Sequence, residues 1–191
     1  MQGWRKRQED AHIAAISKGE KNDIDIFGVF DGHGGKEISK FVSNHFIDEL
    51  IKNKNISKDM SLALKETFLK MDEIMQTKDG LEEIKKYCLE SKKEDELQSK
   101  NAQQNPQMKL LDALIPQKNP ESNDIINRTG CTACVTTFDE TNKKIYFANA
   151  GDSRVVFCKN GKAEAGSIDH KPNLKTEKDR IYKVNGWVTN G

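Results

Sequence analysis

The chain has 191 residues, of which 32% are charged and 35% hydrophobic, with a formal net charge of +1 at pH 7, so its length suits one domain with a sizeable core. The balanced charge provides no broad basic field, which argues against nucleic acid as the main partner. No apolar run approaches the ~18 residues of a membrane span, and the N-terminus shows neither a signal peptide nor a myristoylation glycine, so we expect a cytoplasmic or nuclear protein with no membrane partner.

The chain opens on a charged cluster that includes Arg5, Glu9 and Asp10. Taken alone, such a cluster is a solvated surface. Apolar runs over 11–16 and 24–30, separated by a polar turn, predict a hairpin of two strands. Pairing would bring Glu9 and Asp10 to the same end of the sheet as Asp31. Because crowded carboxylates repel unless a cation neutralises them, the pairing predicts a metal site.

The second run ends abruptly in the turn Asp31-Gly32-His33-Gly34-Gly35. Glycine allows the backbone to approach a ligand closely, and a carboxylate at the end of a strand is a usual metal ligand. A plain polar turn that closes the strand is the alternative. A nucleotide-phosphate loop is excluded, because Lys36 is followed by Glu37 rather than by Ser or Thr.

Two amphipathic helices are predicted next, over 36–52 and 58–75, and we expect them to form a layer over the sheet. Residues 77–124 are rich in Lys, Glu, Gln, Asn and Ser, which indicates a charged, low-complexity and partly disordered insertion. Within it, 81–97 could form a charged surface helix. The apolar cluster over 109–115 either binds a partner or is a simple surface excursion.

Core-like sequence returns at Gly130, with strands predicted over 131–138, 145–150 and 155–158. Apolar residues at both parities predict that these strands are covered on both faces, so the chain builds a sandwich of sheets. The polar kink over 149–154 has the composition of a hairpin turn held by hydrogen bonds of Asp152 and Ser153.

Turn and cap signals mark the remaining elements of this half. Asn160-Gly161 is a strong hairpin signal. Thr176 begins a capping box that would open a short helix to about Asn185, with Gly186 ending it.

The four cysteines are Cys88, Cys131, Cys134 and Cys158. The second and third have the C-x-x-C spacing, but no second pair or nearby histidines complete a structural zinc site. Three of the four lie in strand-like runs, so we expect buried thiols that act as small hydrophobes.

Six motifs occur in a fixed order: GWRKRQEDAH, FGVFDGHGG, RTGCTA, ANAGDSRVV, DHKP and EKDRI. Together they resemble the metal-dependent protein serine/threonine phosphatases of type 2C, the PPM family, over 1–76 and about 125–191. The resemblance implies an α+β fold, a four-layer α/β/β/α sandwich in which helix pairs flank a central antiparallel β-sandwich. It also implies a dinuclear Mn²⁺ or Mg²⁺ site at one end of the sandwich, and phosphoproteins as substrates.

The resemblance further implies metal-binding roles for four residues. Asp31 matches the carboxylate that bridges the two metals, and Gly32 matches a ligand that binds through its backbone carbonyl. Glu9 and Asp10 match acidic positions of the same site, some of which act through metal-bound water. Hard cations of this kind require oxygen ligands.

Two further residues match catalytic positions of the family. Arg5 matches the arginine that holds the substrate phosphate, a role that guanidinium geometry suits. His33 matches the histidine proposed as general acid for the leaving alkoxide. Two cations ~3.5–4 Å apart lower the pKa of a bridging water, so no protein nucleophile is needed.

The chain departs from the family pattern in two respects. Asn127 stands where many members have an aspartate linked to a third metal, and the aspartate motifs expected downstream would lie beyond Gly191. We therefore expect residues 1–191 to be the N-terminal part of a catalytic domain, truncated at its C-terminal side. Half a sandwich exposes sheet edges, so the isolated chain should form a homodimer or be less stable than the complete domain.

The leading hypothesis is a protein phosphatase that acts in signalling. The alternative is a catalytically inactive type-2C-like module that binds a protein partner. The departures favour this alternative, whereas the intact set of predicted ligands argues against it.

Overall fold

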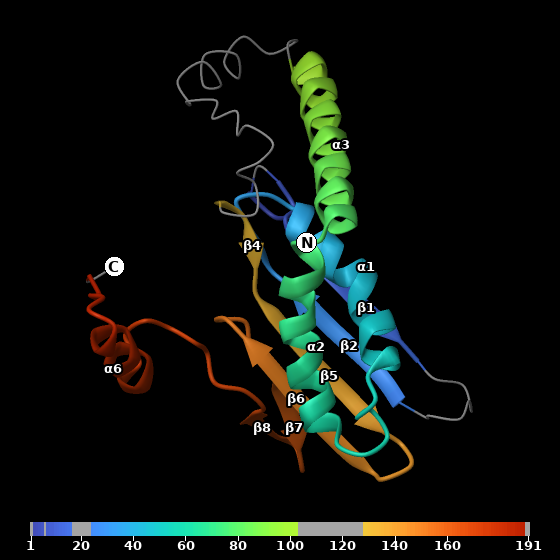
Figure 1. Cartoon of the computed structure of the whole chain (residues 1–191), viewed down its shortest axis with the longest axis vertical. Helices are drawn as coiled ribbons and strands as arrows, with labels where there is room; N and C mark the ends of the chain where they lie inside the picture. The colour runs from blue at the N-terminus through green and yellow to red at the C-terminus, as the bar shows by residue number, and fades with distance from the viewer. Residues whose placement is uncertain (1, 6, 17–23, 103–127, 190–191) are drawn as a thin grey trace.

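The computed structural model describes residues 2–5, 7–16, 24–102 and 128–189, with the backbone alone for 95–102 (Figure 1). Its elements are β1 Ala11–Ala15, β2 Ile24–Phe30, β3 Gly32–His33, α1 Glu37–Lys52, α2 Met60–Met75, α3 Lys78–Ala102, β4 Gly130–Cys131, β5 Ala133–Asp139, β6 Lys144–Ala150, β7 Val156–Lys159, β8 Lys162–Ala165 and α6 Lys175–Lys183. The predicted turn over 17–23, the cluster over 109–115 and Asn127 lie outside the described residues. In the described ranges, no helix is both long and apolar enough to cross a bilayer.

The predicted hairpin is confirmed as half of a four-stranded antiparallel sheet in the order β1-β2-β5-β6. Its register places Ala11 opposite Phe30. Along β2 the buried residues are Ile26, Gly28 and Phe30, which is the period of two expected when one face of a strand meets the core.

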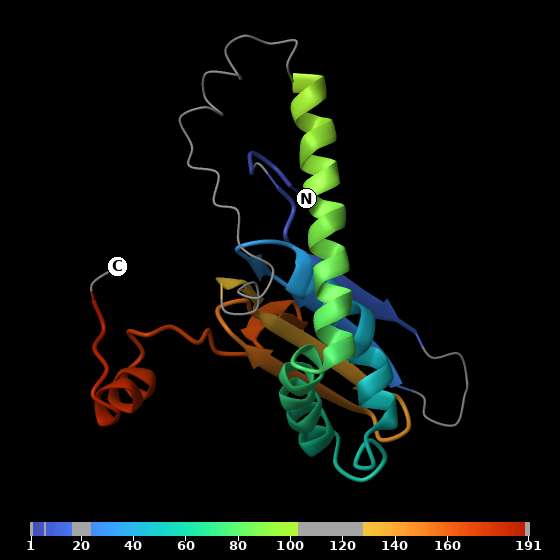
Figure 2. The same cartoon turned by 45° about the horizontal axis from the view of Figure 1, so that its top comes forward.

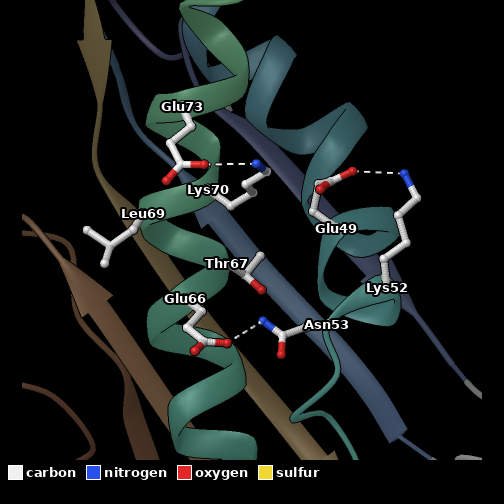
Figure 3. Close-up of a pocket in the computed structure, with 8 residues that line it drawn as sticks. All are labelled: Glu49, Lys52, Asn53, Glu66, Thr67, Leu69, Lys70 and Glu73. Atoms are coloured by element: carbon white, nitrogen blue, oxygen red, sulfur yellow. Dashed lines mark hydrogen bonds and ion pairs between the residues drawn. The ribbon is translucent and has the colours of Figure 1, made fainter.

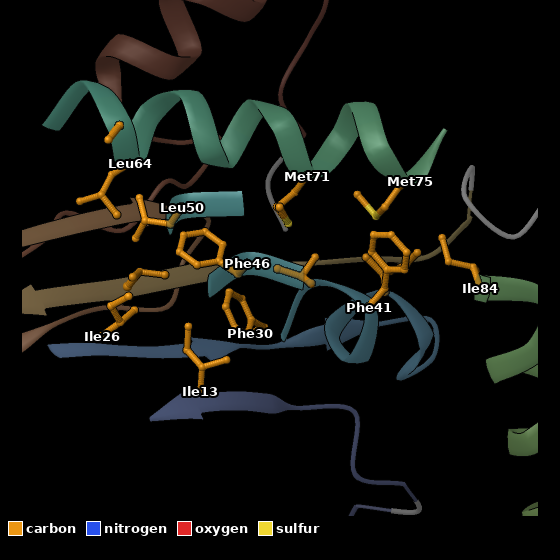
Figure 4. Packing of buried hydrophobic residues seen from close by; sticks show 14 of the residues in the cluster. Ile13, Ile26, Phe30, Phe41, Phe46, Leu50, Leu64, Met71, Met75 and Ile84 are labelled. Atoms are coloured by element: carbon orange, nitrogen blue, oxygen red, sulfur yellow. The ribbon is translucent and has the colours of Figure 1, made fainter. Parts of the chain in front are cut away.

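Helices α1 and α2 lie over that face and bury their apolar stripes against it (Figures 1 and 4). Buried residues of this core include Phe30, Val135, Phe41, Phe46, Leu50, Leu64 and Met71. Each fully buried side chain of this size stabilises the fold by about 1.5–3 kcal/mol. At the start of α2 the Asp59 carboxylate accepts a hydrogen bond from the Leu62 N–H at 3.0 Å, a side-chain N-cap. Both helices confirm the predicted layer.

Helix α3 begins within the segment predicted as a charged insertion. The predicted surface helix exists, but its first half also packs against α1, where Ile84 is 1% exposed and Tyr87 is 9% exposed. Periodicity alone indicates little of this contact, because charged side chains surround the two buried positions. The second half extends past the sheet (Figure 1). The insertion boundary over 77–124 stays a prediction.

Polar side chains join α3 to α1 in a row. Lys36 pairs with Glu94, and Lys40 pairs with Glu90 at 2.9 Å. Further along, the Glu83 carboxylate accepts from the Tyr87 hydroxyl and lies 2.8 Å from His45 Nε2. Such partly exposed pairs are individually weak, so they orient α3 more than they stabilise it.

Low pH is expected to weaken the contact between α1 and α3 by protonating the Glu83 carboxylate. Burial raises the pKa of its carboxyl, but hydrogen bonds from Tyr87 and His45 outweigh burial and hold the pKa below the usual 4.5. A depressed pKa contributes stability that is complete above the unfolded-state value and is lost as the pH falls through the folded-state value.

We therefore expect the free energy of unfolding to decrease below pH 4.5, and to decrease less steeply in Glu83→Gln. Urea denaturation from about pH 7 to about pH 3 measures both slopes. Glu82→Gln, a change at a neighbouring position of the same helix, is the control and should follow the wild type. Equal acid sensitivity of Glu83→Gln and the wild type would contradict the prediction.

The prediction of one continuous strand over 131–138 is wrong, because the strand is interrupted at Thr132. Gly130–Cys131 pairs with β3 in a separate two-stranded ribbon, and the main sheet resumes only at Ala133. The break occurs because the Thr132 N–H donates to the Asp31 carbonyl, which turns the backbone away from the sheet edge.

The β7–β8 hairpin is confirmed, and Asn160 and Gly161 take the positive φ values of +52° and +76° that the turn requires. The Phe157 ring stacks on Phe147 of β6, so the hairpin begins a second sheet across from the helices. The expected coverage of these strands on both faces is wrong for Ile145, which is 51% exposed. A two-stranded ribbon is too narrow to cover the sheet.

These layers confirm the predicted α+β sandwich as far as the described residues supply it. Helix α6 stands apart from the sheet in both views (Figures 1 and 2) and buries no side chain. The predicted capping box is wrong: Leu174 is the N-cap residue, without a side-chain hydrogen bond, and Thr176 lies inside the helix. Asn185, at φ +60°, follows its C-terminus, one residue before Gly186.

All four cysteines are free. Cys134 is buried as predicted, and burial raises its pKa and raises the pKa of Cys131 to about 12, so neither thiol is reactive at neutral pH. The prediction is wrong for Cys158, which is exposed on the narrow β7–β8 hairpin.

Candidate functional site

Three of the predicted site residues, Asp31, Gly32 and His33, lie between the end of β2 and the start of α1. Phe30, the last residue of β2, is fully buried and anchors this end of the sheet. The next backbone N–H, that of Asp31, donates to Thr132 Oγ1 at 3.3 Å, and its carbonyl accepts from the Thr132 N–H at 2.9 Å. The Asp31 side chain is 44% exposed. A firmly held backbone therefore presents this carboxylate to solvent.

The glycines of this loop allow close backbone contacts. A Cβ at Gly32 would lie 2.3 Å from the Glu9 carbonyl oxygen, and one at Gly34 would lie 2.6 Å from the Arg128 carbonyl oxygen. Gly34 also has φ +81°, a conformation that side chains disfavour. The loop thus packs between the segments that contain Glu9 and Arg128, and only glycine fits at positions 32 and 34.

Glu9 and Asp10 precede β1 at the same end of the sheet. Since Ala11 pairs with Phe30, Asp10 and Asp31 are the residues that follow at this end of the two strands. Among the described residues, no three His, Cys, Asp or Glu side chains meet closely enough to hold a metal. The structure brings the segments together, and closure of the carboxylates around an ion stays a prediction.

His33 lies on β3, two residues after Asp31, and its side chain is 64% exposed. Its Nδ1 lies 3.0 Å from the Asp31 carbonyl oxygen. Because a carbonyl only accepts, Nδ1 must carry the hydrogen, which leaves Nε2 as the atom that can exchange a proton.

Arg5 lies in an exposed turn, where its N–H donates to the Gln2 carbonyl at 3.2 Å and its own carbonyl accepts from Gln2 Nε2 at 2.8 Å. The turn fixes the backbone and leaves the guanidinium exposed. The assignment of Arg5 to substrate phosphate stays a prediction.

A second loop, 149–154, reaches the same region through Thr132, whose Oγ1 lies 2.7 Å from Ser153 Oγ. The loop is held from its other side by Arg154, which donates to both carboxylate oxygens of Asp169 at 2.8 and 2.5 Å. This hydrogen bonding and charge hold the pKa of Asp169 below its usual range. The kink is therefore more than the local turn predicted from its composition.

These contacts have no local signal in the sequence. Thr132 and Ser153 lie in motifs that carried the family resemblance, but nothing in either motif indicates that the two hydroxyls meet. Ser39, whose Oγ donates to the Glu9 carbonyl at 2.5 Å, falls in no motif. Only the folded chain brings these residues to the site.

A separate groove of about 360 Å³ lies between the C-terminal half of α1 and the middle of α2 (Figure 3). Its charged side chains already have partners: Lys52 pairs with Glu49, Lys70 pairs with Glu73, and the Glu66 carboxylate accepts a hydrogen bond from the Asn53 amide. None of the predicted site residues lines this groove, so it offers no alternative centre for the chemistry.

Comparison with known proteins gives a consistent result. The sequence matches the family described as "Protein phosphatase 2C" over residues 1–88 and 78–191. Over its full length the chain is 42% identical to "Probable protein phosphatase 2C 4" of Paramecium tetraurelia, and it covers 52% of that protein. It is 35% identical to "Probable protein phosphatase 2C 21" of Arabidopsis thaliana, and covers 54% of it. The chain spans about half the length of the curated relatives it matches.

Solved structures share the fold at low sequence identity. A phosphatase from a pathogenic strain of Toxoplasma gondii matches 98% of this chain and 56% of its own, with a TM-score of 0.54 and 19% identity. A Caenorhabditis elegans sex determining protein also matches 98% of this chain, and 38% of its own, with a TM-score of 0.60 and 22% identity. The sequence matches cover the whole chain, and the chain belongs to the protein phosphatase 2C family.

Proposed function

We propose that the full-length protein hydrolyses phosphoserine and phosphothreonine in protein substrates with the help of divalent metal ions, Mn²⁺ or Mg²⁺, and that this chain supplies part of the site. The observation that supports the proposal is the register of the antiparallel β1–β2 pair, in which Ala11 lies opposite Phe30, so that Asp10 and Asp31 follow at the same end of the two strands. Family membership supports the reaction class.

The donor set fits hard divalent cations. The carboxylates of Asp31 and Asp10 and the Gly32 carbonyl offer oxygen atoms of the kind that such cations bind, and the Glu9 carboxylate lies next to Asp10 in the chain. These four residues would hold the ions. When bound, two such ions activate water and neutralise charge on the phosphoryl oxygens.

The chain's own residues have two tasks beyond metal binding. Arg5 would hold the phosphate, because its planar guanidinium can donate two parallel hydrogen bonds to phosphoryl oxygens. In its imidazolium form, which carries a hydrogen on each ring nitrogen, His33 would give the Nε2 proton to the serine or threonine oxygen that leaves, while the Asp31 carbonyl holds Nδ1–H and fixes the ring.

The test is hydrolysis of p-nitrophenyl phosphate and of a phosphothreonine peptide by the full-length protein with Mn²⁺, with Mg²⁺ and with EDTA. We expect turnover with either ion and none with EDTA. Turnover that persists in EDTA would refute the metal-dependent reaction. Absence of turnover under all conditions would favour the protein-binding module instead.

A cytoplasmic or nuclear location, and a role in signalling, remain part of the proposal. The expected homodimer of the isolated chain also remains a prediction. Sedimentation at several concentrations would test it, and a monomer at every concentration with cooperative unfolding would contradict it.

A further inference from the structure

Ser39 fixes the main chain of the acidic segment Glu9–Asp10 through a hydrogen bond. It lies on the first turns of α1 and is fully buried. Its Oγ donates to the Glu9 carbonyl at 2.5 Å and also lies 3.0 Å from the Lys36 carbonyl. The hydroxyl thus joins α1 to a segment 30 residues earlier in the chain, next to two of the proposed metal ligands.

Thr132 holds the other acidic segment in the same manner. Its side chain is buried between β4 and β5, and its Oγ1 accepts the Asp31 N–H at 3.3 Å. Because Oγ1 acts as acceptor there, its own hydrogen is available to Ser153 Oγ, 2.7 Å away. One hydroxyl therefore joins Asp31 to the loop that carries Asp152.

We infer that Ser39 and Thr132 are positioning residues that set the separation of the Glu9–Asp10 segment from Asp31, and so tune affinity for the divalent metal. The inference rests on the proposed function. Neither hydroxyl is a proposed ligand, and each bonds the main chain of a residue that is one. Groups in this indirect position change metal affinity by about 10- to 100-fold when removed.

The test measures Mn²⁺ binding by electron paramagnetic resonance in the full-length protein, so it does not depend on turnover. Thr132→Val and Ser39→Ala, which delete the hydroxyls, should each weaken Mn²⁺ binding by about tenfold or more. Thr132→Ser retains the hydroxyl and should bind Mn²⁺ within about threefold of the wild type.

Two variants are matched controls. Thr137→Val changes a buried threonine of β5 whose hydroxyl has no hydrogen-bond partner among the described residues. Ser43→Ala changes a serine of α1 whose Oγ bonds the Lys40 carbonyl at 2.9 Å, within its own helix. Both should bind Mn²⁺ like the wild type.

The outcomes separate this inference from the proposed function. If the wild type and Asp31→Asn both fail to bind Mn²⁺, the proposed function fails and the inference fails with it. If Asp31→Asn alone loses binding while Thr132→Val and Ser39→Ala retain it, the inference is overturned and the proposed function stands. Equal loss in Thr132→Ser and Thr132→Val would show a role in packing, which also overturns it.

A further variant covers the case in which Thr132→Val does not fold. Ser153→Ala removes the partner of Thr132 from a half-exposed loop. It should weaken Mn²⁺ binding by about fivefold, because Thr132 loses one of its two side-chain hydrogen bonds. Unchanged Mn²⁺ binding in Ser153→Ala would then refute the part played by Thr132.

Discussion

Asp31→Asn is expected to lower metal-dependent phosphate hydrolysis by about a thousandfold or more, equivalent to about 4 kcal/mol of transition-state stabilisation. The amide has nearly the same shape as the carboxylate but lacks its charge. The backbone hydrogen bonds of Asp31 to Thr132 do not involve the Asp31 side chain, so the loop should keep its conformation. The loss should therefore come from the metal site and not from the fold.

The measurement is the rate of p-nitrophenyl phosphate hydrolysis at saturating Mn²⁺, together with the melting temperature of each variant. Asp48→Asn, at an exposed position on α1, is the control and should retain full activity. If Asp31→Asn hydrolyses the substrate within about tenfold of the wild type, Asp31 does not have the central role proposed for it.

Local patterns are sufficient for the elements that carry the site. The alternation in β2 and the helical stripes of α1 and α2 predict elements that the structure confirms, because each buries one face against a common core. The Asn160-Gly161 turn is predictable for a different reason, since few residue pairs accept its backbone conformation.

Where the sequence-based predictions are wrong, contacts outside the local pattern decide the outcome. Thr132 interrupts a run of strand-forming residues because it bonds Asp31, 101 positions away. Its N–H donates to the Asp31 carbonyl, and its Oγ1 accepts from the Asp31 N–H. Cys158 has the neighbours of a core residue but lies on a hairpin too narrow to bury it. The last helix begins at Lys175, one residue before the predicted capping residue Thr176, so Leu174 occupies the N-cap position and Thr176 lies in the first turn.

The sequence predicts the residue types of the site, but it does not predict the residues that hydrogen-bond the site's main chain. The Asp31 turn and the acidic segment before β1 are visible as motifs. The supporting hydroxyls belong to Ser39, which lies in no motif, and to Thr132, whose motif does not indicate its contacts. Their hydrogen bonds join residues 30 and 101 positions apart. No local pattern carries information over such separations.

Gly32→Ala is expected to destabilise the fold by about 3 kcal/mol or more, because overpacking against a fixed backbone cannot relax by a change of rotamer. The added Cβ would lie 2.3 Å from the Glu9 carbonyl oxygen and 2.9 Å from Ser39 Oγ. Relief of the clash requires the Glu9 segment to move away from the Asp31 loop, so metal affinity should fall as well. Urea denaturation and Mn²⁺ titration measure the two effects.

Gly130→Ala is the matched control for this prediction, since Gly130 lies on the strand paired with β3 and an added Cβ there would meet no atom within 4 Å among the described residues. It should change the free energy of unfolding by less than about 1 kcal/mol. If Gly32→Ala is as stable as Gly130→Ala, the Glu9 segment is not packed against the loop. The close approach of the two acidic segments, on which the proposed metal site depends, would then be wrong. A large loss in the free energy of unfolding in Gly32→Ala, without a loss in Gly130→Ala, would instead show that the stability of the fold depends on the geometry of the site.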